Sequence, residues 1–362
     1  MKERVVIAMS GGVDSSVAAA ILKKEGYEVI GLTMCFNLPD APRKKPACCG
    51  IQGIEDARRV AHKLGIRHYV LNMQKALKDK VIDDFCSEYL NGRTPNPCVR
   101  CNQYLKFDIL LKKALALGAE CLATGHYARI ATRSGGRKAT SREYLLEKAK
   151  DKSKDQSYFL YRLTQNQLRH IFFHLGDYTK TQVRILARRF GLPVADKTAS
   201  QEICFLPQID YRGFLKAQLV NKISPGSIMD SQGRTLGQHK GIPFYTIGQR
   251  QGLGIALGHP VYIAKIDHKT NVITVGRKDE VEKREFLVSH PHFVLKPAKK
   301  KIALKVRIRY NHKEAAAEIS PCGRKLRVCF KKPQFAITPG KSAVFYNRDI
   351  VVGGGIIDKV LN

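Results

Sequence analysis

The sequence predicts an α/β fold followed by β structure, with a doubly wound parallel sheet at the N-terminus and two small β-barrel-like domains after it. Three observations support this order. Apolar strands alternate with helical periodicity over the first 120 or so residues, short alternating β segments begin near residue 223, and a charged stretch at 278–284 precedes a second β unit. We therefore expect domains at residues 1–205, 206–280 and 281–362.

The N-terminal elements follow one another as strand, helix and strand. Residues 5–9 are all apolar, as expected for a strand buried on both faces. Apolar residues then recur at helical spacing until Gly26, and residues 27–34 form a second apolar run. The same alternation predicts a helix at 54–64, a strand at 67–73 and a helix at 76–90.

The C-terminal part is predicted to be β-rich. Strands are expected at 261–267, 272–276, 302–310, 325–330 and 342–346, separated by turns that contain Gly, Asn or Asp. The basic run at 296–301 is interpreted as a solvated face, because such runs are more often solvated than bound to a partner.

Composition indicates a polyanionic partner. The chain has 63 Lys and Arg against 31 Asp and Glu, which gives a formal net charge of +32. Nucleic acid fits best, because basic side chains that neutralise phosphates release condensed counterions. The sequence has no long apolar run, and its N-terminal apolar stretch is too short for a secretory signal, so we expect a cytoplasmic protein without membrane attachment. In that reducing compartment the ten cysteines should remain thiols or bind metal.

The most specific motif lies between the first strand and the first helix. In SGGVDSS, residues 10–16, the glycines allow successive N–H groups to point into one concavity at a helix N-terminus, where phosphate binds well. Ser10 and Ser15 add hydroxyl groups, and Asp14 is suited to hold Mg²⁺. The alternative interpretation is that Asp14 merely caps the helix.

Three cysteines are candidates for chemistry. Cys98 and Cys101 form a CxxC within GRTPNPCVRCN, residues 92–102, just before a helix. Their position beside arginines predicts a lowered thiol pKa. A structural zinc half-site or buried inert thiols are the alternatives. Cys204, in SQEICF, is either a core thiol or a reactive one, and it could meet Cys101 only through folding.

The SGGVDSS loop resembles that of the PP-loop ATP pyrophosphatases, which have a Rossmann-like fold, split ATP between its α and β phosphates and adenylate a substrate. This resemblance implies that ATP and Mg²⁺ bind here. The residues that would contact ATP are Ala8, Met9, Ser10, Gly11, Gly12, Val13, Asp14, Ser15, Met34 and Gly125.

Further motifs are similar to those of the tRNA-specific 2-thiouridylase family. They are GRTPNPCVRCN, ATGHYAR (123–129), KDQSYFL (154–160), SQEICF (200–205), TIGQRQGLG (246–254) and TPGKSAVFY (338–346), and they span nearly the whole chain in one order. The resemblance implies ATP-dependent adenylation of the C2 oxygen of the wobble uridine, U34, followed by sulfur transfer. Cys204 would carry a persulfide, and Cys101 would be the nucleophile that leaves a Cys101–Cys204 disulfide.

The same resemblance implies contacts with tRNA. Asn96, Pro97 and Cys98 would lie against the target base, and the other tRNA contacts would be His126, Lys154, Asp155, Gln156, Arg309, Tyr310 and Lys341. Read without the resemblance, His126 could equally be a turn histidine whose ring is satisfied by the backbone. The sulfur would come from a donor protein, either a cysteine desulfurase or a sulfur-relay carrier.

One departure from the family pattern opens a second route. Many relatives have Asp where this chain has Cys98, so Cys98, Cys101 and Cys204 could together ligate a [4Fe–4S] cluster whose open iron carries sulfide. Three other functions compete with 2-thiolation: a non-catalytic tRNA-binding protein, a PP-loop synthetase for a small metabolite, and a tRNA 4-thiouridine synthetase. The block at residues 94–102 does not resemble the last of these families.

Overall fold

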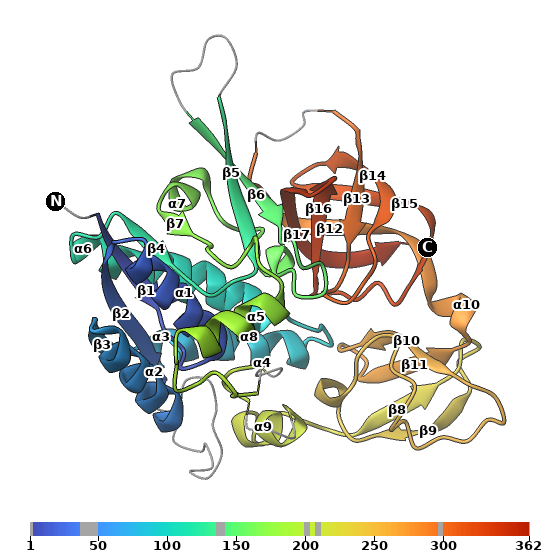
Figure 1. Ribbon diagram of the computed structural model, residues 1–362. Helices are drawn as coiled ribbons and strands as arrows, with labels where there is room; N and C mark the ends of the chain where they lie inside the picture. The colour runs from blue at the N-terminus through green and yellow to red at the C-terminus, as the bar shows by residue number, and fades with distance from the viewer. Residues whose placement is uncertain are drawn as a thin grey trace. The chain divides into compact units, whose positions relative to one another are not determined.

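A computed structural model describes residues 3–36, 50–134, 142–198, 203–206, 211–295 and 300–361 (Figure 1). Its contacts divide the chain into two compact units. Unit 1 contains residues 1–81, 98–209 and 349–351, and unit 2 contains residues 82–97, 210–348 and 352–362. The segment 82–97 therefore packs with the β-rich half of the sequence. The division into three domains stays a prediction.

Unit 1 is built on a parallel sheet, as the alternating pattern predicts. Its described strands are β1 (Arg4–Ala8), β2 (Glu28–Cys35), β3 (Arg67–Asn72), β4 (Cys121–Ala123) and β7 (Ile171–Phe172), in the spatial order β3-β2-β1-β4-β7. Each neighbouring pair is parallel. The order reverses beside β1, which places the loops after β1 and β4 at a switch point where α/β sheets bind ligands.

Helices pack against this sheet through apolar side chains. The described helical segments of the unit are α1 (Val13–Lys24), α2 (Ile51–Leu64), α3 (Gln74–Leu77), α5 (Pro97–Arg100), η2 (Cys101–Leu110), α6 (Leu111–Ala116), η3 (Ser157–Phe159), α7 (Gln165–Arg169) and α8 (Lys180–Arg189). Val17 of α1, Val60 of α2 and Val183 of α8 share one core with Ile7 of β1.

Two features of unit 1 were not anticipated. The expected helix at 76–90 is divided by a π-helical stretch, η1 (Lys78–Ile82), from which α4 (Asp83–Leu90) continues in unit 2. A hairpin of β5 (Ala128–Ser134) and β6 (Arg142–Lys148) follows β4, and Glu147 of β6 pairs with Ile350. No helix in the described ranges is both long and apolar enough to cross a membrane.

After the segment 82–97, unit 2 continues with α9 (Tyr211–Gln218) and a mixed sheet in the order β10-β11-β8-β9. The described elements of this part are β8 (Gly226–Met229), β9 (Thr235–His239), η4 (Ile242–Phe244), β10 (Tyr262–Asp267), β11 (Val272–Gly276) and α10 (Lys278–Val281). The expected strands at 261–267 and 272–276 are confirmed as an antiparallel pair.

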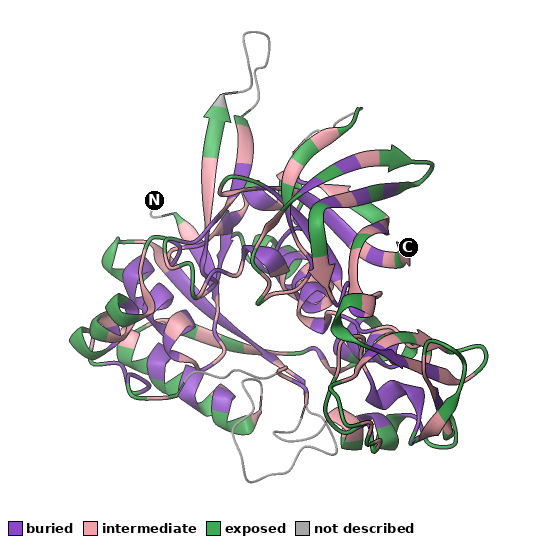
Figure 2. Cartoon of the chain, turned by 90° about the vertical axis from the view of Figure 1, so that its right-hand side faces the viewer, coloured by how far each residue is buried: buried purple, intermediate pink, exposed green. Residues whose placement is uncertain are grey.

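The C-terminal strands form a closed barrel, which confirms the predicted barrel architecture. The described strands are β12 (Glu282–Phe293), β13 (Ile302–Arg307), β14 (Ala315–Cys322), β15 (Lys325–Phe335), β16 (Ser342–Asn347) and β17 (Ile350–Leu361). They follow the order β12-β15-β14-β13-β16-β17, and β12 also pairs with β17, which closes the sheet. Phe286, Val328 and Phe345 are fully buried inside it, and buried positions alternate with more exposed ones along β14 and the first half of β15 (Figure 2).

Candidate active site

The loop after β1 leaves the first turn of α1 open. Gly12 is the N-cap residue of α1, and no side chain caps the helix. The interpretation of Asp14 as a helix cap is therefore wrong. Gly11 has φ +69°, and a Cβ added there would lie 2.1 Å from the carbonyl oxygen of Gly53, so the tight turn requires glycine. The uncapped N–H groups and the helix dipole together favour an anion at this loop.

Serine hydroxyls hold the loop in shape. The Ser10 backbone N–H donates to Ser15 Oγ at 3.2 Å, and Ser15 Oγ donates to the Gly12 carbonyl at 3.2 Å. Ser16 Oγ also donates to the Gly12 carbonyl, at 2.8 Å. Without a ligand these hydroxyls therefore organise the turn that presents the backbone N–H groups.

The Asp14 carboxylate is held by two groups that sequence reasoning did not single out. Lys180 Nζ lies 2.6 Å from Asp14 Oδ1, and the hydroxyl of Tyr127 donates to the same oxygen at 2.8 Å. Burial, and then the charge and hydrogen bond of Asp14, raise the pKa of Tyr127 far above its usual value. Tyr127 lies within the ATGHYAR motif, whereas the position of Lys180 as the first residue of α8 gives no local signal of this contact.

A second ammonium group reaches the same loop. Lys197 Nζ donates to the Gly11 carbonyl at 3.0 Å and to Asp56 Oδ2 at 2.6 Å. Asp56 is buried, and Arg59 also donates to it. Although burial alone raises the pKa of Asp56, the hydrogen bonds from Lys197 and Arg59 outweigh it and lower that pKa. Lys180 and Lys197 thus bring to the loop the positive charge that its own sequence lacks.

The other residues predicted to contact ATP gather at the carboxyl edge of the sheet. Gly125 follows β4, and a Cβ added there would lie 2.6 Å from the backbone nitrogen of Ser15, so this residue packs directly on the start of α1. Met34 is buried near the end of β2. The Met9 backbone N–H donates to the Leu32 carbonyl at 2.8 Å, which continues the β1–β2 pairing into the loop.

The structure brings Cys101 and Cys204 together. Cys101 is buried at the start of η2, where the helix widens to π geometry, and its side chain is hydrogen-bonded to that of Cys204 rather than linked to it by a disulfide. The lowered pKa that we expected for Cys101 is wrong. The hydrogen bond with Cys204 and burial raise the pKa of Cys101 well above its usual value, and the positive charge of Lys106 offsets this only in part.

The three cysteines do not converge as metal ligands. Cys98 lies on α5 and is half-buried. In the described ranges, which contain all three of these cysteines, no group of three or more His, Cys, Asp or Glu side chains is arranged to hold a metal ion. Cys98, Cys101 and Cys204 are thus not grouped as metal ligands in this conformation.

Comparisons with known proteins agree with these features. A family model described as tRNA methyl transferase HUP domain matches residues 3–208, one described as tRNA methyl transferase PRC-barrel domain matches 212–277, and one described as aminomethyltransferase beta-barrel domain matches 283–357. The tRNA-specific 2-thiouridylase MnmA of Clostridium acetobutylicum is 47% identical over 99% of this chain and 100% of its own length. The chain belongs to the tRNA-specific 2-thiouridylase family.

Other matches fall into two groups. MnmA 2 of Caldanaerobacter subterraneus subsp. tengcongensis, another tRNA-specific 2-thiouridylase, is 51% identical over 98% of both chains. A solved complex of a 4-thiouridine synthetase with RNA and ATP aligns with 56% of this chain and 45% of its own, at 19% identity and a TM-score of 0.35. The 2-thiouridylases thus match the chain over its whole length.

Two of the predicted tRNA contacts in unit 1, His126 and Asp155, are buried inside it. His126 is buried between the rings of Phe107 and Phe173, and Thr124 Oγ1 lies 2.7 Å from its Nδ1. Burial, and then the charge of Lys106, lower the pKa of His126 well below its usual value, so the ring is neutral. The alternative that the backbone satisfies this ring is not what the structure contains, because side chains do so.

The KDQ residues differ from one another in role. Asp155 is buried and accepts hydrogen bonds from the backbone of Ala149 and from Ser157. Gln156 brackets Tyr127: its Oε1 accepts the Tyr127 N–H at 3.0 Å, and its own N–H donates to the Tyr127 carbonyl at 2.8 Å. Lys154 is half-buried. In this conformation Gln156 positions Tyr127, which donates to Asp14, and Asp155 holds the backbone of its own turn. Their tRNA contacts stay predictions.

The remaining predicted tRNA contacts belong to unit 2, apart from Cys98. Asn96 is half-buried and Pro97 is buried, at the end of the segment 82–97. Arg309 donates through Nη1 to the Phe335 carbonyl at 3.0 Å, and Tyr310 follows it, half-buried. Burial, and then the like charge of Arg309, lower the pKa of Lys341 to about 8. Arg309 and Lys341 therefore form one basic group on the C-terminal barrel.

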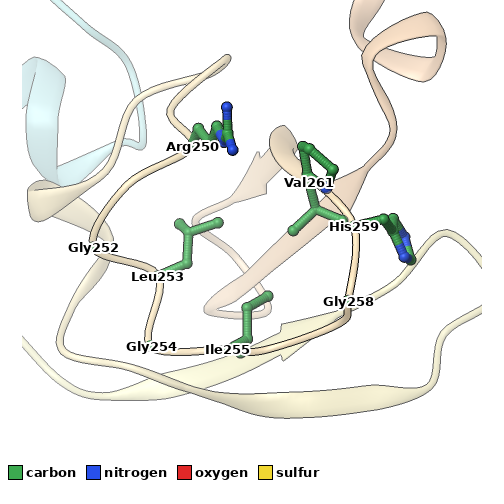
Figure 3. Close-up of a pocket in the computed structure, with 9 residues that line it drawn as sticks. Arg250, Gly252, Leu253, Gly254, Ile255, Gly258, His259 and Val261 are labelled. Atoms are coloured by element: carbon green, nitrogen blue, oxygen red, sulfur yellow. The ribbon is translucent and has the colours of Figure 1, made fainter.

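Two cavities lie outside these residues. One, of about 400 Å³, is an open pocket lined by the glycine-rich loop 250–261 of unit 2, with Leu253 and Ile255 on the loop and Arg250 and His259 on opposite sides (Figure 3). The other, of about 470 Å³, lies in unit 1 and is lined by Arg58, Arg59, His62, Lys63, Gly191 and Pro193. Neither is lined by a residue predicted to contact ATP or by a candidate cysteine.

Proposed function

We propose that this chain is a tRNA-uridine 2-sulfurtransferase that uses ATP to replace the C2 oxygen of U34 in tRNA with sulfur. The single observation that carries the mechanism is the hydrogen bond between the side chains of Cys101 and Cys204. A carbonyl oxygen of uridine is a poor leaving group, and adenylation converts it into AMP, which is a good one. Family membership and net positive charge support tRNA as the substrate.

In the first step, the open N-terminus of α1 would hold the phosphates that leave as pyrophosphate. Mg²⁺ would neutralise phosphate charge when bound, and the Asp14 carboxylate, which accepts from Lys180, would hold it. Lys180 and Lys197 would stabilise the charge that develops on the leaving pyrophosphate. Met34 and Gly125 would bound the adenosine side of the site.

In the second step, Cys204 would carry the sulfur as a persulfide. Its terminal sulfur attacks C2 of the adenylated uridine, and AMP leaves with the original oxygen. The Cys101 thiolate then attacks Cys204 Sγ, which breaks the S–S bond to the transferred sulfur and forms a Cys101–Cys204 disulfide. A cellular dithiol reductant supplies the two electrons that restore both thiols. Side chains already in hydrogen-bond contact can form this disulfide with little movement.

The finer parts of this function are also proposals. A sulfur-donating protein, either a cysteine desulfurase or a sulfur-relay carrier, would load Cys204, and the reaction would take place in the cytoplasm, where reductants and tRNA are available. The [4Fe–4S] route remains the second candidate because the thiol of Cys98 is present, but the geometry of the described side chains favours the disulfide route. Protein purified without oxygen should lack iron and iron–sulfur absorption, and the presence of both would favour the cluster instead.

The test is anaerobic incubation with unmodified tRNA, Mg-ATP and a persulfide donor, followed by mass spectrometry of the digested nucleosides. We expect 2-thiouridine and AMP in equal amounts from wild type, and no 2-thiouridine from Cys101→Ala or Cys204→Ala. Cys322→Ala, which removes an exposed thiol, is the matched control and should retain activity. Without reductant, one turnover should leave a peptide that links Cys101 to Cys204.

Two outcomes would favour the competing functions. A protein that binds tRNA and ATP but forms no thiolated nucleoside would be a non-catalytic binder. AMP formation that does not depend on tRNA would favour a small-metabolite synthetase.

A further inference from the structure

The segment 82–97 comes between β3 and β4 in sequence, yet it packs in unit 2 with the β-rich parts of the chain. Tyr89 of α4 stacks on Tyr211 with ring centroids 5.6 Å apart. Gly92 has φ +66°, and a Cβ added there would lie 2.7 Å from Cγ2 of Ile266 in β10. The residue that follows the segment is Cys98. The stretch predicted to lie against the target base therefore begins in the barrel unit.

Arg93 ties this segment to the last strand of the barrel. Its Nε donates to Glu88 Oε2 at 2.9 Å, its Nη1 donates to the Asp358 carbonyl at 3.2 Å, and its Nη2 donates to the Ile357 carbonyl at 3.3 Å. The guanidinium thus joins α4 to β17 with three differently directed donors. A lysine ammonium cannot reproduce that planar fork.

The neighbouring Thr94 is held by two other parts of the unit. Its N–H donates to the Pro339 carbonyl at 2.8 Å, and its Oγ1 donates to Thr246 Oγ1 at 3.2 Å. A Cβ added at Gly340 would lie 2.8 Å from the Thr94 nitrogen and 3.0 Å from Glu88 Oε2. Thr94 is also buried, so a shift of the turn 338–341 must move it.

The same turn leads to the basic group of the barrel. Ile357 of β17 bonds both to Arg93 and to this turn. Its carbonyl accepts hydrogen bonds from Arg93 Nη2 and from the Gly340 N–H, and its own N–H donates to the Lys341 carbonyl at 2.8 Å. Arg309 lies near enough for its charge to lower the pKa of Lys341. Lys341 and Arg309 are thus linked through one strand residue to the segment that precedes Cys98.

From these contacts we propose that Arg93 is a positioning residue for the transfer of sulfur, which fixes the start of the target-base stretch, Thr94 to Pro97, to the barrel surface that carries Arg309 and Lys341. The inference rests on the proposed function. It assigns the barrel two tasks, binding tRNA and setting the place at which the stretch around Cys98 meets the wobble uridine. A misplaced reacting group costs rate without necessarily costing substrate affinity.

The test compares Arg93→Gln and Arg93→Lys with wild type under saturating ATP and persulfide donor. We expect kcat for 2-thiouridine formation to fall about 100-fold for Arg93→Gln, with partial rescue in Arg93→Lys and a KM for tRNA within about twofold of wild type. Persulfide loading of Cys204 and ATP binding should be unchanged, which a general loss of structure would not allow. Arg327→Gln, which breaks an exposed ion pair with Glu285 on the same barrel, is the matched control and should match wild type.

A second variant acts from the barrel side. Gly340→Ala leaves every side chain of the segment 82–97 chemically unchanged, but its methyl group would lie 2.8 Å from the Thr94 nitrogen at a position with φ +91°, so Thr94 must shift. Gly340→Ala should lower kcat as Arg93→Gln does. It tests the proposal by itself if Arg93→Gln does not fold. The inference is overturned if either variant raises the KM for tRNA at unchanged kcat, or if a folded Arg93→Gln turns over like wild type. A wild type that makes no 2-thiouridine refutes the proposed function instead, so the two failures are distinguishable.

Discussion

Lys180 Nζ lies 2.6 Å from Asp14 Oδ1, in an ion pair that joins the first turn of α8 to the first turn of α1. The Lys180 side chain is 15% exposed and that of Asp14 is 33% exposed, so water screens the pair only partly. An ammonium at this point compensates a carboxylate that would otherwise repel ATP. If Asp14 holds Mg²⁺ as proposed, the same ammonium would be released from the pair and could contact a phosphate oxygen.

The first prediction concerns that lysine. Lys180→Met should lower the rate of AMP formation from tRNA and Mg-ATP by about 10²- to 10³-fold, because it removes a fixed positive charge aimed at the leaving pyrophosphate. Rapid-quench measurement of AMP in a single turnover checks this. Lys112→Met, which removes an exposed ammonium paired with Asp108, is the matched control. If both variants form AMP at the wild-type rate, Lys180 has no part in the adenylation step.

The second prediction separates two glycines of the ATP site by the space around them. Gly125→Ala should abolish ATP binding, because its methyl group would lie 2.6 Å from the Ser15 nitrogen and 2.8 Å from the Asp14 carbonyl carbon, both of which are backbone atoms that cannot yield cheaply. Gly12→Ala meets only Ser10 Oγ, at 3.4 Å, and should retain most of the affinity. Calorimetric titration with Mg-ATP and a thermal melt of each variant measure this. Equal affinities for the two variants would contradict the assigned position of Gly125.

The third prediction follows from the contact between the two thiols. Because the hydrogen bond with Cys204 and burial both raise the pKa of Cys101, its thiolate fraction at pH 7 is very small and should rise about tenfold per pH unit well past pH 9. Alkylation of Cys101 by iodoacetamide, followed by peptide mass spectrometry, should show this slope. Cys204→Ala removes the first cause and should make Cys101 react faster at a given pH. A plateau below pH 8 in wild type would contradict the raised pKa.

Much of the fold could be predicted from sequence, because its signals are local. The apolar run 5–9, the glycines at 11 and 12 and the helical spacing after them are each complete within a few residues, and the structure contains the strand, loop and helix that they predict. The closure of the C-terminal barrel depends on β12 pairing with β17, such as Phe286 with Val360, and no local pattern encodes that pairing.

The site was predictable only in part, for the same reason. The phosphate loop is contiguous in sequence, whereas Lys180 and Lys197 reach Asp14 and Gly11 from positions more than 160 residues away. The expected low pKa of Cys101 rested on its sequence neighbours, whereas burial and Cys204 decide its environment in the fold. Charge near a residue in sequence is thus a weak guide when the side chain points into a core.

The fourth prediction concerns pH and the barrel surface. Because burial and the charge of Arg309 lower the pKa of Lys341 to about 8, Lys341 is mostly protonated at pH 7 and mostly neutral at pH 9. Lys341, the ammonium predicted to contact phosphate, loses its charge over that window, so the affinity for tRNA should fall as pH rises from 7 to 9. The slope of log affinity against log salt concentration should also become less steep, by the amount that about one phosphate contact contributes. Arg309→Gln removes a like charge, so the midpoint of the fall should move to higher pH even though overall affinity drops.

Lys341→Met is the control for this assignment. Its affinity for tRNA should not fall between pH 7 and pH 9, which separates this lysine from other titrating groups in the protein and from the bases of tRNA. Filter binding at three salt concentrations across this pH range measures all three proteins, and a fall in affinity that persists in Lys341→Met would assign the titration to another group.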